Sequence, residues 1–458
     1  MDIAKGALFA QQTALRVVAN NVANVNTEGY MRQVAVLDES ESVITAYGQI
    51  GNGVSVSRVM AYYDKFLENS VAKENNAAKE WETYESYFGR IESVLDESNT
   101  NLTSNVANFF NAWQSLSVDP TSTTAQTNVV MEGANVARSI RNIYNELKSV
   151  QTEVNDKVAQ SVVEINGILQ SIAQMNTKIY ESDGGTNDVT TISEMTQLVK
   201  ELSGIMDVQT FTDENGGVTV MTTGGKILVD RGVVNELSAE RSTTDNLYRI
   251  VWNGGSSSSV DITDSINGGS LKSLIDIRDN QIPEFITVVN DLAESLITEV
   301  NDLHSAGYNA NGTTGINFFK AVTGDFAANI DISDEVKTDA GNVATAYSAA
   351  DTSGNDVALA LADLGSSSVS IGGQDTTYTD YTASIASRIG SLSRNAQDLS
   401  EYHQTLLTTM ETKRDSVSGV TIDEEMTNLI KYQYAYQAAA RLLNTADTLF
   451  TALLSVVQ

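Results

Sequence analysis

Few side chains in this sequence are of the types that usually carry out catalysis or bind metals. There are two histidines, His304 and His403, and no cysteine, so a metal site of the usual nitrogen or sulfur kind is nearly excluded. His403 falls on a helical row of apolar residues, where a packed histidine is far commoner than a catalytic one. His304 follows the end of a predicted helix, where it could complement the negative end of the helix dipole.

Acidic residues are abundant, but they do not form a recognisable site. The run Asp213-Glu214-Asn215-Gly216 resembles the start of a calcium loop. It lacks the later bidentate glutamate, so a hairpin turn is the better interpretation. Asp276 and Asp279 could be a carboxylate pair, yet such pairs are common in so acidic a chain. Phosphate-loop, dinucleotide-binding, G-x-S-x-G and H-E-x-x-H motifs are absent from the sequence. We therefore predict no enzyme, no catalytic residue, no cofactor and no metal, with an acidic enzyme as the alternative.

The charge balance restricts the possible partners. With 28 basic and 59 acidic residues, the net charge is 28 − 59 = −31, which disfavours nucleic acid and anionic lipid surfaces. The sequence has no apolar run of about 20 residues that could span a bilayer. The first residues also lack the basic-then-apolar order of a cleaved secretion signal, so any export would need another route.

The strongest pattern lies at the two ends of the chain. Apolar residues recur every seven positions near the C-terminus at Ile422, Leu429, Tyr436, Leu443, Phe450 and Val457. A matching N-terminal series contains Leu8, Leu15 and Val22. This repeat predicts two helices, each with a narrow apolar seam that packs on a partner helix. The partner could be the other terminus or the protein's own core.

Between the ends, the pattern predicts long helices interrupted by one β-rich insertion. An unbroken helix over 123–181 would be roughly 90 Å long at 1.5 Å per residue, which implies a rod. The fold class we predict is mainly α with an inserted β domain, in which both termini form a long antiparallel helical rod or coiled coil. The expected domains are an inner terminal coiled coil (1–60 and 415–458), a helical rod (61–205, 270–305 and 381–414), a small outer β domain (206–269) and an irregular segment rich in Gly, Asn and Ser (306–380).

The residues after the first helix resemble a known signature. The sequence closely resembles the N-terminal signature of the flagellar rod, hook and hook-associated proteins at Asn20, Asn21, Asn24, Asn26, Thr27, Gly29 and Tyr30. The run from Ser418 to Asp447 is similar to the C-terminal signature of the same axial family. Gly53-Val54-Ser55-Val56 and Gly268-Gly269-Ser270-Leu271 favour the hook-associated branch, at the hook–filament junction.

This resemblance implies a function in assembly. Members of the family are exported through the flagellum's own type III channel, so the chain would be secreted and extracellular. It would stack helically with other copies through the residues of both seams, with the terminal helices as the inner wall. The partners implied are the hook protein, the second hook-associated (junction) protein and an export chaperone at the C-terminal helix. The alternatives are another axial subunit (hook, rod or filament protein) or a secreted coiled-coil adhesin.

Overall fold

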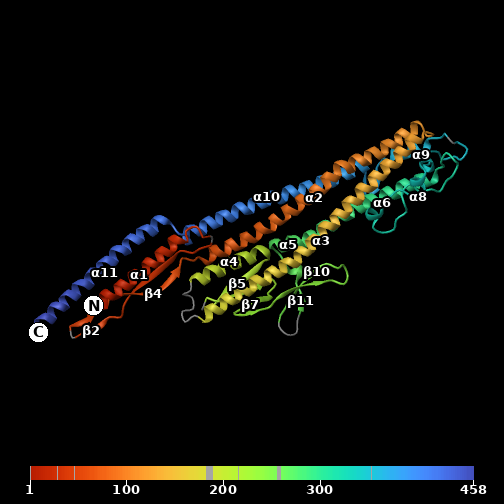
Figure 1. The fold of residues 1–458 in the computed structure, drawn as a ribbon. Helices are drawn as coiled ribbons and strands as arrows, with labels where there is room; N and C mark the ends of the chain where they lie inside the picture. The colour runs from red at the N-terminus through yellow and green to blue at the C-terminus, as the bar shows by residue number, and fades with distance from the viewer. Residues whose placement is uncertain are drawn as a thin grey trace.

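The molecule is an elongated helical rod that continues into a narrower bundle, with both chain termini at the same end (Figure 1). The structure, a computed structural model, describes residues 2–457 except 28, 46, 182–188, 215, 255–258 and 352. The predicted fold class, mainly α with inserted β structure, is confirmed. Among the described residues, every helix is too short or too polar to cross a membrane.

The narrower end, which we call the terminal bundle, is built from both termini. Its elements are α1 (Asp2–Ala23), β1 (Gln33–Glu39), β2 (Val43–Thr45), β3 (Gly48–Ile50), β4 (Val54–Ala61) and α11 (Ile422–Val457). Helices α1 and α11 run antiparallel side by side (Figure 1). Strands β1 and β4 pair antiparallel and pack on α1, and β2 pairs with β3 as a hairpin. A small cluster of Ala14, Val17 and Ala35, with Val59 and Tyr432 packed on it, holds these layers together.

The rod consists of long helices that pack along one another. Its elements are α2 (Lys65–Val118), α3 (Thr123–Glu181), α4 (Val189–Ile205), α5 (Gly269–Asp276), α6 (Ile282–Ala306) and α10 (Tyr378–Ser418). Helix α2 begins where the Asp64 carboxylate accepts the backbone N–H groups of Phe66 and Leu67, an N-cap that satisfies otherwise unpaired donors. It ends just before Pro120. Helix α3 has the bounds that the apolar period predicts.

The sequence pattern predicts one helix over 270–303, but the structure divides it into α5 and α6. A π-helical turn, Ile277–Gln281, lies between α5 and α6. Pro283 follows at the start of α6, and it lacks the backbone N–H that a continuous α-helix would need there. The turn places Arg278 in the protein interior, where its side chain is fully buried.

The β insertion forms two antiparallel sheets on the side of α3. One has the order β5-β6-β7-β8 and the other β11-β10-β9. The strands are β5 (Val208–Thr212), β6 (Val218–Thr222), β7 (Ile227–Asp230), β8 (Val233–Val234), β9 (Leu237–Arg241), β10 (Tyr248–Asn253) and β11 (Ser259–Asp261), followed by a 3₁₀ turn (Thr263–Ser265). Pattern reasoning missed β8 and β9. Val220, Leu228 and Ile250 are buried in the same apolar cluster as the rod helices, so the insertion shares the rod's core.

The segment predicted as irregular caps the far end of the rod. It contains α7 (Phe326–Asn329), α8 (Asp334–Thr338), a 3₁₀ turn (Ala340–Asn342), α9 (Asp356–Leu364), β12 (Val369–Ile371) and β13 (Gln374–Thr376). Phe318 lies just before this series of short elements. Its ring centroid is 5.5 Å from that of Phe109 and 5.4 Å from that of Trp113. The cap is therefore held by an aromatic core, although little of it is regular.

Candidate assembly surface

The asparagine-rich turn after α1 is held by the side chain of Asn21, which is fully buried. Its amide nitrogen donates to the carbonyl oxygen of Gln33 at 2.8 Å, and its oxygen accepts the Gln33 backbone N–H at 2.9 Å. The Tyr30 hydroxyl also donates to the Asn21 oxygen at 2.9 Å. The Asn21 side chain thus bonds to both backbone groups of Gln33, the first residue of β1, as a neighbouring strand would. These bonds fix the angle at which β1 leaves α1.

The other signature residues complete the same turn. Asn24 donates to the backbone and side-chain oxygens of Asn20, and Thr27 donates to the side-chain oxygen of Asn24. Gly29 has a φ of 73°, a left-handed conformation that favours glycine. Its carbonyl oxygen accepts the Ser193 hydroxyl of α4 at 2.9 Å. The resemblance named these residues, and the structure shows that they connect the terminal bundle to the rod. Asn26 of the signature is exposed.

Arg32 joins this turn to the break between α10 and α11. Its backbone N–H donates to the Ser418 carbonyl at 2.8 Å, at the end of α10. Its guanidinium pairs with Glu425 at 2.9 Å and also with Glu424, both in the first turn of α11. Glu425 is almost fully buried. A buried ion pair of this kind fixes one geometry, because removing either partner leaves the other charge unpaired.

The electrostatics of the turn follow from this burial. Tyr30 lies against the same carboxylate, and burial, followed by the negative charge of Glu425, raises the pKa of the Tyr30 hydroxyl to about 12. The phenol therefore stays protonated and remains able to donate to Asn21.

The structure places the predicted C-terminal seam partly against α1. Leu429, Tyr436 and Leu443 are half-buried, whereas Ile422 and Phe450 are 52% and 58% exposed. The side chain of Val457 lies outside the described residues. Within the seam, Ala439 is buried and Tyr432 packs on Ala14 and Val17 of α1. These seam residues come together in one chain, while their contact with other copies stays a prediction.

The N-terminal seam is displaced from its predicted position. Leu8, Leu15 and Val22 are only half-buried. The buried row of α1 is instead Ala10, Ala14, Val17, Val18 and Asn21. Helix α1 packs on the β1–β4 ribbon as well as on α11, and small side chains allow the close approach on both sides. In the sequence, only the spacing of Ala10 and Ala14 by four residues indicated that this row of α1 is buried.

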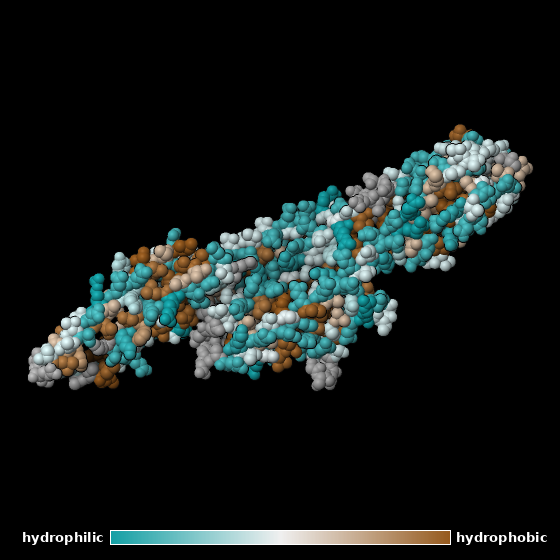
Figure 2. Space-filling view, viewed as in Figure 1, coloured by the Kyte–Doolittle hydropathy of each residue, from teal (hydrophilic) through white to brown (hydrophobic). Residues whose placement is uncertain are grey.

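Helix α11 keeps a second apolar face that no element of the described chain covers. Ile430, Tyr434, Leu442 and Leu449 are between 49% and 69% exposed. Figure 2 shows apolar, brown atoms gathered over the terminal bundle, where α11 lies. Monomeric soluble proteins rarely expose large apolar patches, so this face indicates an interaction surface.

The groups that could have carried chemistry are structural. His403 pairs with Glu74 at 2.6 Å. His304 does not complement a helix end as a cation. It lies in the last turn of α6, fully buried, with Nδ1–H donating to the Ile316 carbonyl and Nε2 accepting the Ala344 N–H. Burial lowers its pKa to about 4, so the imidazole is neutral.

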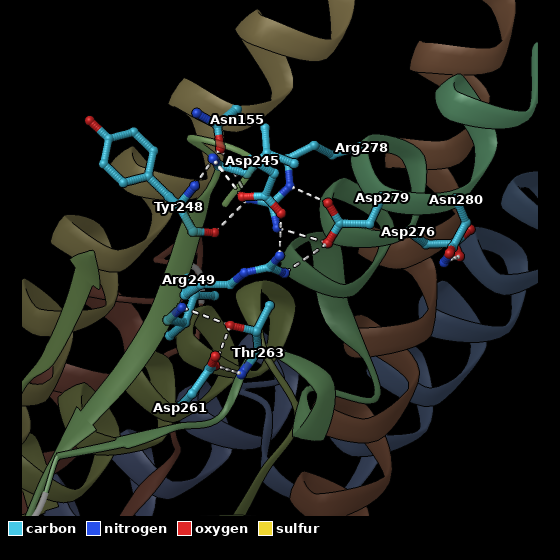
Figure 3. A network of polar contacts seen from close by, with 12 residues as sticks. Asn155, Asp245, Tyr248, Arg249, Asp261, Thr263, Asp276, Arg278, Asp279 and Asn280 are labelled. Atoms are coloured by element: carbon cyan, nitrogen blue, oxygen red, sulfur yellow. Dashed lines mark hydrogen bonds and ion pairs between the residues drawn. The ribbon is translucent and has the colours of Figure 1, made fainter. Parts of the chain in front are cut away.

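The two candidate carboxylates each hold the π turn in place. The Asp276 carboxylate accepts the Tyr84 hydroxyl at 3.0 Å. Asp279 accepts two bonds from the guanidinium of Arg278, at 2.7 and 2.8 Å. Figure 3 shows Arg278 reaching from the π turn towards Asn155 of α3 and Tyr248 of β10. Asp276 therefore fastens the π turn to α2, whereas Asp279 belongs to the Arg278 cross-link between the rod and the β insertion.

The calcium-loop resemblance corresponds to a hairpin turn between β5 and β6, as predicted. Asp213 accepts the Gly217 N–H at 2.9 Å, and Asn215 lies outside the described residues. Within the described part of the chain, His, Asp and Glu side chains form no group that could hold a metal ion.

Comparisons with known proteins agree over nearly the whole chain. A family model, the flagellar hook-associated protein FlgK helical domain, matches residues 88–319. Two others match the ends: flagella basal body rod protein at 1–30, and flagellar basal body rod FlgEFG protein C-terminal at 413–456. The chain is 27% identical to flagellar hook-associated protein 1 of Bacillus subtilis (strain 168), over 98% of this chain and 96% of the relative. Identity to the same-named protein of Escherichia coli (strain K12) is 24%, over 99% and 98%.

A solved structure agrees with the fold. The flagellar hook junction protein FlgK from Burkholderia pseudomallei superposes with a TM-score of 0.68 at 13% identity, over 76% of this chain and all of that chain. Since the FlgK helical-domain model covers half of the sequence and the relatives align end to end, this chain belongs to the flagellar hook-associated protein FlgK family, a structural component of the bacterial flagellum at the hook–filament junction.

Proposed function

We propose that this chain joins the hook to the filament by helical self-assembly through its terminal bundle. One observation carries the proposal: α11 is apolar on two faces, and α1 covers only one of them. Burial of apolar surface is the dominant favourable term in most protein association. Neighbouring copies that cover Ile430, Leu442 and Leu449 would complete the helix.

The family matches support a role of the ends in stacking. The two models named for basal body rod proteins match only residues 1–30 and 413–456, while the FlgK model matches the middle. The ends are therefore what this chain has in common with the rod proteins. A shared terminal module would let different subunits follow one another along a common axis.

The same reasoning assigns roles to the other regions. The ends (1–60 and 415–458) form the inner assembly domain, and 61–205, 270–305 and 381–414 form the rod around it. The β region (206–269) lies outside, and 306–380 caps the rod. The partners are other copies, the hook protein and the second junction protein. An export chaperone shields α11 before assembly, and the chain is secreted and has no enzymatic activity.

The test is a double substitution on the seam, Leu443→Asp with Phe450→Asp, in cells that lack their own copy of the gene. We expect hooks without filaments, because two carboxylates in the seam between α11 and α1 cannot be buried without a large desolvation cost, so the terminal bundle would not form. The control is Asn444→Asp with Thr451→Asp, which adds acidic groups at exposed polar positions of α11 that lie on neither apolar face and should leave filaments in place.

Two measurements make the result decisive. Variant protein recovered from the medium shows that export still operates, and an unchanged helical signal in circular dichroism shows that the rod is folded. If the seam variant is exported and folded and the hooks still carry filaments, the terminal seam is not the assembly surface.

A further inference from the structure

The β2–β3 hairpin has apolar side chains that remain largely exposed to solvent in the single chain. Val43, Ile44 and Ile50 are 51%, 85% and 52% exposed, and Val43 pairs with Ile50 across the hairpin. Figure 1 shows this hairpin on the side of α1 that faces away from α11. An isolated two-stranded hairpin is at best marginally stable in water, so this one needs a surface to pack on.

The second face of α11 has the shape and length for such a contact. At 100° per residue, Ile430, Tyr434, Leu442 and Leu449 fall within a sector of about 120°. The centre of this sector lies roughly 140° around the helix from Tyr432, which packs on α1. The sector therefore faces away from α1 and is open for a partner.

The charges on the two surfaces are complementary. From Asp38 to Ile50 the sequence has three acidic residues and no basic one. The exposed sector of α11 contains Lys431 and Arg441, and neither forms an ion pair with any described residue. After Glu425, the only acidic residue in the helix is Asp447, which falls outside the sector. Such a basic, apolar face is unusual in a chain with a net charge of −31, and complementary potentials favour a specific pairing.

We propose that the β2–β3 hairpin of one copy docks on the second face of α11 in a neighbouring copy of this chain. This inference rests on the proposed function and deepens it, because it names the element that covers α11. The hairpin cannot reach that face in its own chain, since α1 lies between them. Each copy then gives a hairpin to one neighbour and receives one from another, a head-to-tail contact that can repeat around a tube.

The test uses the absence of native cysteine. The variant Ile44→Cys with Leu442→Cys is produced as the only copy in flagellated cells, and isolated flagella are oxidised and examined on a denaturing gel. We expect a ladder of disulfide-linked dimers, trimers and longer species, because every copy would be linked to two neighbours. The matched control pairs Ile44→Cys with Asp447→Cys, which lies five residues on and about 140° around the helix, and should stay monomeric.

A charge exchange adds a second measurement. Adding Lys431→Glu and Arg441→Glu to the cysteine pair should lower the yield of the ladder about tenfold, because acidic groups then face acidic groups. Adding Glu39→Lys and Glu41→Lys to that variant should restore the yield. A merely structural effect of the substitutions would not be reversed in this way.

The outcomes separate this contact from the proposed function. If the Ile44→Cys, Leu442→Cys protein stays monomeric in flagella that contain it, the hairpin contact is refuted. This includes the case in which another protein covers α11. If the Leu443 and Phe450 variant still abolishes filament attachment, assembly through the terminal bundle stands without the hairpin. If that variant carries filaments, the proposed function falls, while a ladder would still show that the hairpin and α11 of neighbouring copies meet.

Discussion

Replacing Arg278 by methionine should weaken the attachment of the β insertion to the rod while leaving the long helices folded. Arg278 is fully buried and links three elements. Its guanidinium donates two bonds to Asp279, one to Asn155 of α3 at 3.1 Å and one to the Tyr248 carbonyl of β10 at 2.7 Å (Figure 3). Methionine fills a similar volume but donates none of these bonds.

The magnitude follows from what is left behind. Removing one partner of a buried ion pair costs about 3–5 kcal/mol, because the remaining charge is unpaired. The Asp279 side chain is 22% exposed and lies 3.8 Å from Arg249, so it keeps some compensation. We therefore expect a loss near the lower end, about 3 kcal/mol of unfolding free energy. Arg278→Lys should lose part of this, since an ammonium cannot bond bidentately to the carboxylate.

The assay is native-state hydrogen exchange with urea unfolding as a second measurement. Amides of β9, β10 and β11 should lose protection in the methionine variant, while those of α3 keep it. Arg249→Met is the matched control: this side chain is 31% exposed, so its ion pairs should contribute less than about 1 kcal/mol. Unchanged protection of β10, with stability within about 0.5 kcal/mol of the parent, would refute the role of Arg278.

Two further predictions concern the rod and its cap. Gly133→Ala should destabilise the fold by about 1–3 kcal/mol through overpacking, because a Cβ there would lie 2.7 Å from the Phe318 ring; urea unfolding measures this. Gly167→Ala, in the same helix with open space around it, should instead stabilise by about 0.5–1 kcal/mol, and equal effects of the two substitutions would contradict the packing described. His304 should make stability fall as the pH drops from about 6.5 towards 4, since its pKa in the folded protein is lowered to about 4 and the unfolded chain takes up the proton first. From about pH 7 to 5 we expect a loss of about 2 kcal/mol, flattened in His304→Gln; an identical pH profile in that variant would remove this explanation.

Helical periodicity predicted the parts of the fold that depend on local pattern. Helix α3 has the predicted bounds, 123–181, because one apolar row continues through it and no proline interrupts it. The C-terminal spacing also placed Leu429, Tyr436 and Leu443, which are half-buried, on one side of α11, while their role as an assembly surface stays a prediction. Both cases need only the identity of residues within a few turns of one another.

The parts that escaped prediction depend on contacts between distant residues. The bond between Asn21 and the backbone of Gln33 cannot be inferred from an asparagine-rich run, which by itself indicates only a turn. His304 is neutral because its two partners, the backbones of Ile316 and Ala344, lie in the segment with the weakest pattern. The buried row of α1 was misplaced because the spacing alone does not reveal that strands pack on a second side.

The most direct test of the central claim is an electron cryomicroscopy map of the hook–filament junction in flagella that contain this chain. We predict that α1 and α11 line the central channel, with the rod helices outside them and the β insertion outermost. The same map should show each α11 covered on both apolar faces by protein. A map in which the terminal bundle lies on the outer surface, or in which either apolar face of α11 stays open to solvent, would contradict the account.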